Sequence, residues 1–206
     1  DAALRIQPGR YVMDEPWLRE WWPKIAATQR VLAFDIGANA GTWTVDLMTL
    51  YYRVISIEPD TRCEPPIGLE YDRRAVWSHN GTETLHSRER ALQSSLLPEH
   101  AVGDGGREVS VITETPVQCV TLDSLAEQHG PPDFIKIDIE GGEVEALKGA
   151  TANCFRRAVW LIEVHDTYDD VAKELTRLGY SEVLAITHPW PQAAKGHEWI
   201  LAEPKK

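Results

Sequence analysis

Acidic residues that directly follow apolar runs are the first candidates for chemistry in this sequence. Asp35 ends one apolar run and opens a glycine-bearing turn, Asp35–Gly41, which precedes a helical pattern over 41–50. Glu58 ends the next apolar run. A strand, a glycine turn and a helix form the first unit of a nucleotide-cofactor site, and an acid at the next strand end can hold ribose hydroxyls.

The chemistry of this turn favours a cationic ligand over a phosphate. Only Gly37 and Gly41 are glycines, whereas a dinucleotide turn has three, so that the backbone can approach a pyrophosphate. The carboxylate of Asp35 would also repel phosphate. S-adenosylmethionine carries adenosine, a sulfonium and an ammonium group but no phosphate, and we expect it to contact Asp35, Gly37, Asn39, Gly41 and Glu58. The alternative is an ordinary turn whose glycines adopt positive φ.

A second group of charged residues lies on two later predicted strands. Because side chains alternate between faces along a strand, Lys136, Asp138 and Glu140 should share one face of the first strand. Glu163 and His165 should likewise share one face of the next. Central strands of a parallel sheet are normally apolar on both faces, so these charges need partners or a site. Ligands bind at the carboxyl ends of such strands.

These residues predict proton transfer from a hydroxyl. His165 is the first candidate for a general base, because neutral imidazole is available near pH 7. Asp138 is the alternative base, or it holds the ammonium group of the cofactor. Glu163 would orient His165 or the substrate hydroxyl, Lys136 would balance the acids, and Glu140 would contact the substrate.

Three alternatives remain open for this charged group. It can be a buried ion-pair network centred on Lys136. Glu140 can simply start the following helix, where an acid suits the helix dipole. Our first interpretation uses no metal, but Asp138, Glu163 and His165 offer oxygen and imidazole ligands that suit several divalent ions.

Alternating apolar runs and helical patterns predict an α/β fold that would position these residues. Strands are expected near 31–35, 54–58, 73–77, 134–139, 158–164, 181–186 and 197–202. Helices are expected near 14–27, 41–50, 121–129, 142–149 and 167–178. Strands that alternate with helices imply parallel pairing with right-handed crossovers. Only a short turn separates the last two strands, so these should pair antiparallel.

The segment 82–118 breaks this alternation and is expected to be an insertion near the active site. Its stretches 82–86 and 108–113 alternate in polarity and predict a β-hairpin. The connection between them is long, polar and glycine-rich, which favours a mobile cover over the acceptor. Ser94 and Ser95 are its candidate contacts.

Tryptophans near the chain ends are further candidates for packing or binding. Trp190 lies in a stiff proline-bearing loop and is interpreted as a wall of the substrate pocket or, alternatively, as a loop anchor. The tryptophans within the predicted N-terminal helical segment, 1–28, favour packing, because large aromatic side chains dominate cores.

Composition bounds the class of protein and its partners. The length of 206 residues, with 43% hydrophobic and 26% charged residues, predicts a single globular domain over 1–206. A net charge of −11 argues against a nucleic-acid partner. The cysteines, Cys63, Cys119 and Cys154, are odd in number and lack metal-ligand spacing, which favours a reducing, cytoplasmic environment. No apolar run reaches the length of a membrane span.

Taken together, these motifs resemble the FkbM family of S-adenosylmethionine-dependent methyltransferases. The resemblance is carried by Asp35–Gly41, Val120–Leu125, Ile135–Glu143, Leu147–Ala150 and Glu163–His165. It implies a Rossmann-like, seven-stranded sheet with helices on both faces and the last strand antiparallel. It also implies O-methylation of a small-molecule acceptor, namely a sugar, a glycolipid or a natural product. Ser78 stands where the family often has an acid after the third strand, and its expected contact is the adenine. A catalytically inactive cofactor-binding domain of the same fold is the alternative.

Overall fold

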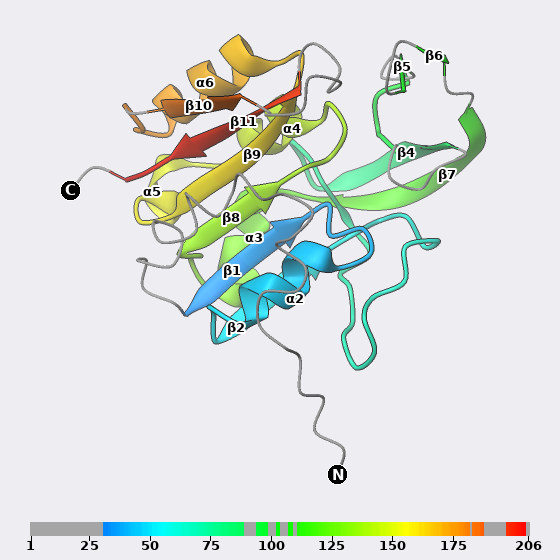
Figure 1. Cartoon of the computed structure of the whole chain (residues 1–206), viewed down its shortest axis with the longest axis horizontal. Helices are drawn as coiled ribbons and strands as arrows, with labels where there is room; N and C mark the ends of the chain where they lie inside the picture. The colour runs from blue at the N-terminus through cyan, green and yellow to red at the C-terminus, as the bar shows by residue number, and fades with distance from the viewer. Residues whose placement is uncertain are drawn as a thin grey trace.

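The computed structural model describes residues 31–88, 94–98, 102–103, 107–108, 111–181, 183–187 and 197–204. Within these ranges, six strands form the main sheet in the order β10-β11-β9-β8-β1-β2 (Figure 1). Their bounds are β1 Leu32–Ile36, β2 Arg53–Ile57, β8 Phe134–Ile137, β9 Val159–His165, β10 Val183–Thr187 and β11 His197–Ala202. The strands β2, β1, β8 and β9 run parallel, and β11 runs antiparallel to both β9 and β10, as predicted.

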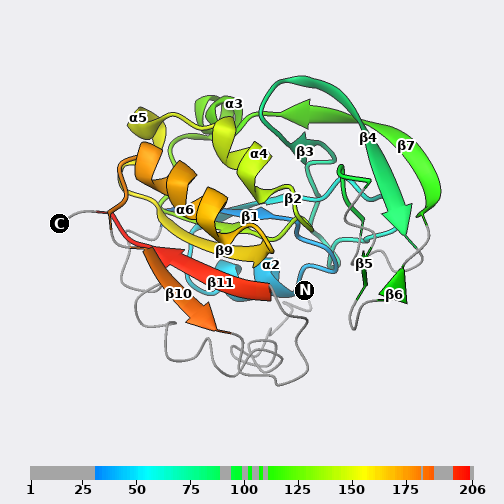
Figure 2. The same ribbon diagram turned by 90° about the horizontal axis from the view of Figure 1, so that it is seen from above.

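Helices cover both faces of this sheet, as Figure 2 shows from above. One face carries α3 (Leu122–His129), α4 (Glu143–Lys148), α5 (Ala152–Phe155) and α6 (Tyr168–Arg177), and the other carries α2 (Thr42–Met48). Alternate residues of each strand therefore enter two different cores. In β8, Ile135 packs with the larger helix group and Phe134 packs with Leu47 of α2. This explains why the central strands are apolar on both faces.

A second sheet stands at one end of the main sheet (Figures 1 and 2). Its strands are β3 Ala75–Val76, β4 Gly81–Arg88 and β7 Val111–Val120, in the order β3-β7-β4. A two-stranded pair, β5 Val102–Gly103 with β6 Arg107–Glu108, accompanies it. In the part of the chain that these strands and helices cover, no helix is both long and apolar enough to cross a membrane.

The place of the third strand is a correction to the seven-stranded expectation. The segment 73–77 contributes only β3, which pairs with β7 instead of with β2. The chain meets β2 at one isolated parallel bridge, between Ile57 and Asp72. Beyond this bridge, the backbone forms its hydrogen bonds with β7, and Trp77 N–H donates to Val120 O at 3.0 Å. Among the described residues, β2 is therefore the edge of the main sheet.

Two other predicted boundaries also shift. β8 ends at Ile137, and the chain turns away through Glu140 at φ 54° and Gly141 at φ 95°, so Asp138 lies beyond the strand. In the hairpin, residues 82–86 pair with residues 114–118 of β7 and not with the predicted 108–113; His86, for example, pairs with Glu114. Within this register, Cys119 pairs with β3 on one side and with β4 on the other. The predicted helix 14–27 falls outside the described residues.

Candidate active site

A pocket opens where the carboxyl ends of β1, β2, β8 and β9 face the second sheet. Its polar lining comes from both sheets and consists of Gly37, Asn39, Glu58, Ser94, Ser95, Asp138, Glu140 and Glu163. Its apolar lining consists of Ile36, Ile57, Pro59, Ala75, Val76, Trp77, Leu85, Leu96 and Ile139. The pocket therefore combines an apolar slot with an acidic end, which is formed by Asp138, Glu140 and Glu163.

The glycine turn after β1 joins three strands at the floor of this pocket. The N–H of Gly37 donates to Ile57 O at 3.0 Å, and Lys136 Nζ donates to Gly37 O at 2.7 Å. Gly37 has φ 75°, and a Cβ added there would lie 1.8 Å from the carbonyl oxygen of Asp138. Only glycine fits this approach, because the backbone conformation and the contact both exclude a side chain.

Glu58 presents a fixed carboxylate at the end of β2. Oε2 accepts a hydrogen bond from Asn39 N at 3.0 Å, and Oε1 accepts one from Asp60 N at 2.8 Å. The side chain is mostly buried yet lines the pocket. Burial raises the pKa of Glu58, although the two N–H donors act in the opposite direction. Its position matches the predicted place for an acid that holds ribose hydroxyls.

Asp35 and Lys136 lie behind the pocket wall and do not line it. Asp35 is fully buried, and its Oδ2 accepts a hydrogen bond from Thr44 Oγ1 at 2.6 Å. Lys136 Nζ lies 3.5 Å from Asp35 Oδ1 and 3.4 Å from Asp138 Oδ2. Burial lowers the pKa of Lys136, but Asp138 and Asp35 outweigh it and raise that pKa overall. Lys136 thus links the turn after β1 to Asp138, as the ion-pair alternative described.

Gly41 also lies away from the lining. It is the residue before α2, with φ 80°, and a Cβ there would approach Pro66 Cδ to 2.5 Å. Gly41 therefore shapes the start of α2, and its contact with the cofactor stays a prediction.

His165 is held by a buried carboxylate that the sequence analysis did not single out. His165 Nδ1 lies 3.1 Å from Glu143 Oε1, and Glu143 is fully buried at the start of α4. Burial alone would lower the pKa of His165, but Glu143 and Glu140 raise it to about 10. These carboxylates favour the protonated imidazolium, so the role of His165 as a general base stays a prediction that requires the neutral form.

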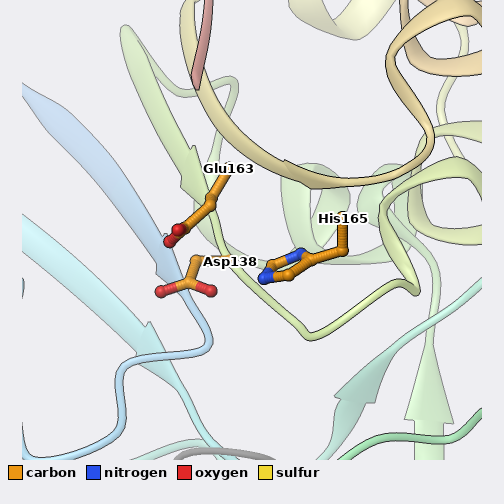
Figure 3. Close-up of side chains that lie close together, drawn as sticks. All are labelled: Asp138, Glu163 and His165. Atoms are coloured by element: carbon orange, nitrogen blue, oxygen red, sulfur yellow. The ribbon is translucent and has the colours of Figure 1, made fainter. Parts of the chain in front are cut away.

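Three ligand-type side chains converge at the acidic end, as Figure 3 shows for Asp138, Glu163 and His165. One potential ligand atom from each lies within 4.8 Å of the others. Glu140 lies beside them, with Oε2 at 3.6 Å from His165 Nε2, and burial raises the pKa of Glu140 to about 8. The predicted convergence of the two strands is therefore present, because β8 and β9 are parallel neighbours.

The remaining candidates occupy different positions. Ser94 Oγ donates to Asp60 Oδ2 at 2.8 Å and Ser95 Oγ donates to Glu140 O at 2.7 Å, and both serines line the pocket. Ser78 does not line it, whereas its neighbour Trp77 does. Trp190 lies outside the described residues.

The sequence analysis missed the apolar half of the pocket. Val76 and Trp77 end the third predicted strand, and this position at a carboxyl end could have identified them as pocket residues. Leu85 and Leu96 gave no such signal, because they reach the pocket through the packing of the second sheet. Glu143 carried the weakest signal, since an acid in the first turn of a helix is normally explained by the helix dipole.

The chain matches known methyltransferases. The sequence model of the methyltransferase FkbM domain matches residues 35–182. The chain is 26% identical over 152 residues to the hexuronic acid methyltransferase AglP of Haloferax volcanii, covering 70% of this chain and 59% of that protein. A precorrin-6y C5,15-methyltransferase from Geobacter metallireducens GS-15 superposes with a TM-score of 0.45 and 14% identity, covering 85% of this chain and 80% of that structure.

A mainly parallel sheet with a ligand pocket at its carboxyl ends defines a Rossmann-like domain. Because the family match extends over most of its length, the chain belongs to the FkbM methyltransferase family. This is a family of methyltransferases, which generally use S-adenosylmethionine.

Proposed function

We propose that this chain binds S-adenosylmethionine in the pocket between its two sheets and transfers the methyl group to a sugar hydroxyl. The observation that carries the proposal is the division of the pocket into an apolar slot, a fixed Glu58 carboxylate and an acidic end. These three parts correspond to the adenine, the ribose and the cationic methionine portion of the cofactor.

The cofactor would run from the second sheet toward β8. Adenine would lie in the slot that includes Val76, Trp77 and Leu96, where an aromatic and aliphatic lining suits a flat base. The ribose hydroxyls would donate to Glu58. The ammonium and sulfonium groups would then face Asp138, whose side chain is 28% exposed beside Lys136.

In the proposed reaction, the oxygen of the acceptor attacks the sulfonium methyl carbon in line with the departing sulfur. The O–CH₃ bond forms, the S–CH₃ bond breaks, and sulfur retains the electron pair in S-adenosylhomocysteine. The hydroxyl proton must pass to a base. We assign this role to Asp138, and the assignment is supported by its position in the pocket lining, whereas His165 is not part of the lining and its Nδ1 contacts Glu143.

A polyhydroxyl acceptor suits the acidic end of the pocket. Carboxylates accept hydrogen bonds, and Asp138, Glu140 and Glu163 together present several acceptors to the hydroxyl donors of a sugar. AglP is a hexuronic acid methyltransferase, which supports a sugar-type acceptor for this chain. Since this chain spans 59% of AglP, the acceptor remains a proposal to be tested directly.

The direct test is methyl transfer from labelled S-adenosylmethionine to a panel of glycosides and uronic acids. We expect label in at least one sugar hydroxyl, and the matching deoxy sugar should accept none. Transfer to amines or carbon centres alone would reject O-methylation. Cofactor binding without transfer to any acceptor would favour the inactive binding domain instead.

A metal-assisted form of the same reaction is the second candidate. The specific observation that favours it is the grouping of Asp138, Glu163 and His165 within 4.8 Å, the ligand set named as an alternative from the sequence.

A further inference from the structure

The side chains at the acidic end come from two adjacent strands and form one compact group. Asp138 follows β8, whereas Glu163 and His165 lie on β9. Figure 3 shows the two carboxylates and the imidazole pointing toward a common centre. One nitrogen or oxygen atom from each side chain lies within 4.8 Å of the others, so small side-chain movements would let a single ion contact all three. Two carboxylates and one imidazole form a ligand set suited to hard or intermediate divalent cations.

The orientation of His165 gives a second, independent indication of a ligand. Its Nδ1 is bound to Glu143 Oε1 at 3.1 Å, which leaves Nε2 on the side of the acidic end. Glu143 is itself fixed, because its Oε1 also accepts a hydrogen bond from Gly141 N at 3.1 Å. Metal-binding histidines typically donate their other ring N–H to such a carboxylate, which sets the tautomer and the ring orientation. Nε2 lies 3.6 Å from Glu140 Oε2, so binding of a cation to Nε2 would replace this contact and release the proton of the imidazolium.

The charge balance also favours a cation. Lys136 is shared between Asp35 and Asp138, and His165 adds a positive charge only while its imidazole is protonated. Glu140 and Glu163 add further carboxylates at the same end of the pocket. A bound divalent cation would supply a large local positive charge and would offset these carboxylates.

We propose that Asp138, Glu163 and His165 bind one divalent cation, with Mn²⁺ or Mg²⁺ as the fitting class. Its remaining coordination positions face the pocket, where two neighbouring hydroxyls of a sugar can chelate it. This role rests on the proposed methyl transfer to a sugar, whereas the binding of the cation does not. A bound cation would lower the pKa of a coordinated hydroxyl, and because Asp138 would then be a ligand of the cation, the hydroxyl proton would pass to water as the oxygen becomes the nucleophile.

Binding of the cation is tested first, without any turnover. The full chain is stripped with EDTA and titrated with Mn²⁺, while electron paramagnetic resonance reports the free ion. We expect one Mn²⁺ per chain. Glu163→Gln and His165→Ala should each weaken binding at least tenfold, and Glu143→Gln should weaken it about 10- to 100-fold, as for other groups that orient a ligand. His79→Ala, an exposed histidine away from the pocket, is the matched control and should bind Mn²⁺ normally.

Folding and function are separated by two further measurements. Each variant is checked by its circular dichroism spectrum and by its affinity for S-adenosylhomocysteine, and Glu163→Gln keeps the test valid where His165→Ala fails to fold. Absence of Mn²⁺ binding to the folded wild type overturns the proposal, and so does binding that none of the three substitutions weakens. If Mn²⁺ binds but no sugar is methylated, only the proposed function fails. If EDTA-treated enzyme methylates a sugar at the full rate, the activating role of the cation fails.

Discussion

At the scale of single residues, Glu58 shows how the backbone prepares a side chain for a ligand. Two N–H groups, from Asn39 and Asp60, each donate a hydrogen bond to one of its two carboxylate oxygens. A carboxylate held in this way needs little reorganisation when ribose hydroxyls arrive, so its contribution to affinity should be measurable.

Replacing Glu58 should therefore weaken cofactor binding. Glu58→Ala removes the acceptors for the ribose, and we expect a loss of about 1–3 kcal/mol in binding free energy by calorimetry. Glu64→Ala is the control, because Glu64 is an exposed acid a few residues further along the chain. Equal affinity of the wild type and Glu58→Ala would remove Glu58 from the site.

A second residue-scale prediction concerns the pH dependence of stability. Asp46 is 5% exposed on α2, and burial raises its pKa from 3.8 to about 6. Because the folded state binds this proton more tightly than the unfolded state, stability falls as pH rises from about 4 to 6, and the full cost remains above pH 6. Asp46→Asn should thus raise the free energy of unfolding by about 1–3 kcal/mol at pH 7.5.

The same substitution should have a much smaller effect near pH 4, where Asp46 is largely protonated in the folded state. Urea unfolding at the two pH values provides the comparison. A gain of equal size at both values would show that the effect does not come from ionisation of Asp46.

At the scale of elements, the turn after β1 depends on a close approach of two backbones. Gly37 and Gly68 both have positive φ, at 75° and 86°. They differ in surroundings, since a Cβ at Gly37 would lie 1.8 Å from Asp138 O, whereas one at Gly68 would meet nothing within 4 Å. Alanine substitutions at these two glycines therefore separate the cost of a positive φ from the cost of a steric clash.

Gly37→Ala should consequently cost more than Gly68→Ala. We expect about 1–2 kcal/mol for Gly68→Ala, from the left-handed conformation alone. Gly37→Ala should cost about 1–3 kcal/mol beyond that and should weaken cofactor binding, because the turn must move away from Asp138. Thermal unfolding and calorimetry measure both effects. Similar losses in the two variants would show that the close approach is not a constraint.

At the scale of the whole molecule, the pocket exists only because two separate sheets face each other. The main sheet supplies Glu58 and Asp138, and the second sheet supplies Val76 and Leu85. A ligand that fills this pocket must therefore contact both sheets at once. A ligand that binds only the folded state stabilises it by an amount that grows with the logarithm of ligand concentration, about 2.7 kcal/mol at 100 times Kd.

Hydrogen exchange should reveal this coupling. On addition of S-adenosylhomocysteine, amides in β3, β4 and β7 should gain protection together with those at the ends of β1 and β2. Glu58→Ala at the same ligand concentration serves as the control and should show a smaller gain. Protection confined to β1 and β2 would place the ligand on the main sheet only.

Local periodicity was enough to predict much of the site from the sequence. The alternation along β8 and β9 predicted that Lys136, Asp138, Glu163 and His165 would converge, because side-chain direction in a strand has a period of two. Apolar runs that alternate with helical patterns likewise predicted the parallel strands and the antiparallel last pair. The face on which each side chain lies depends on short-range geometry, which the order of residues specifies directly, whereas the convergence also required β8 and β9 to be neighbours.

Other features were decided only by contacts between distant segments. The pairing of β3 with β7, the apolar slot between the two sheets and the bond between Glu143 and His165 join residues far apart in the chain. The same is true of Asp35, which the packing of α2 places behind the pocket wall with Thr44. Sequence periodicity tells which face of an element a residue occupies, but the partner that covers this face depends on how all the elements pack together.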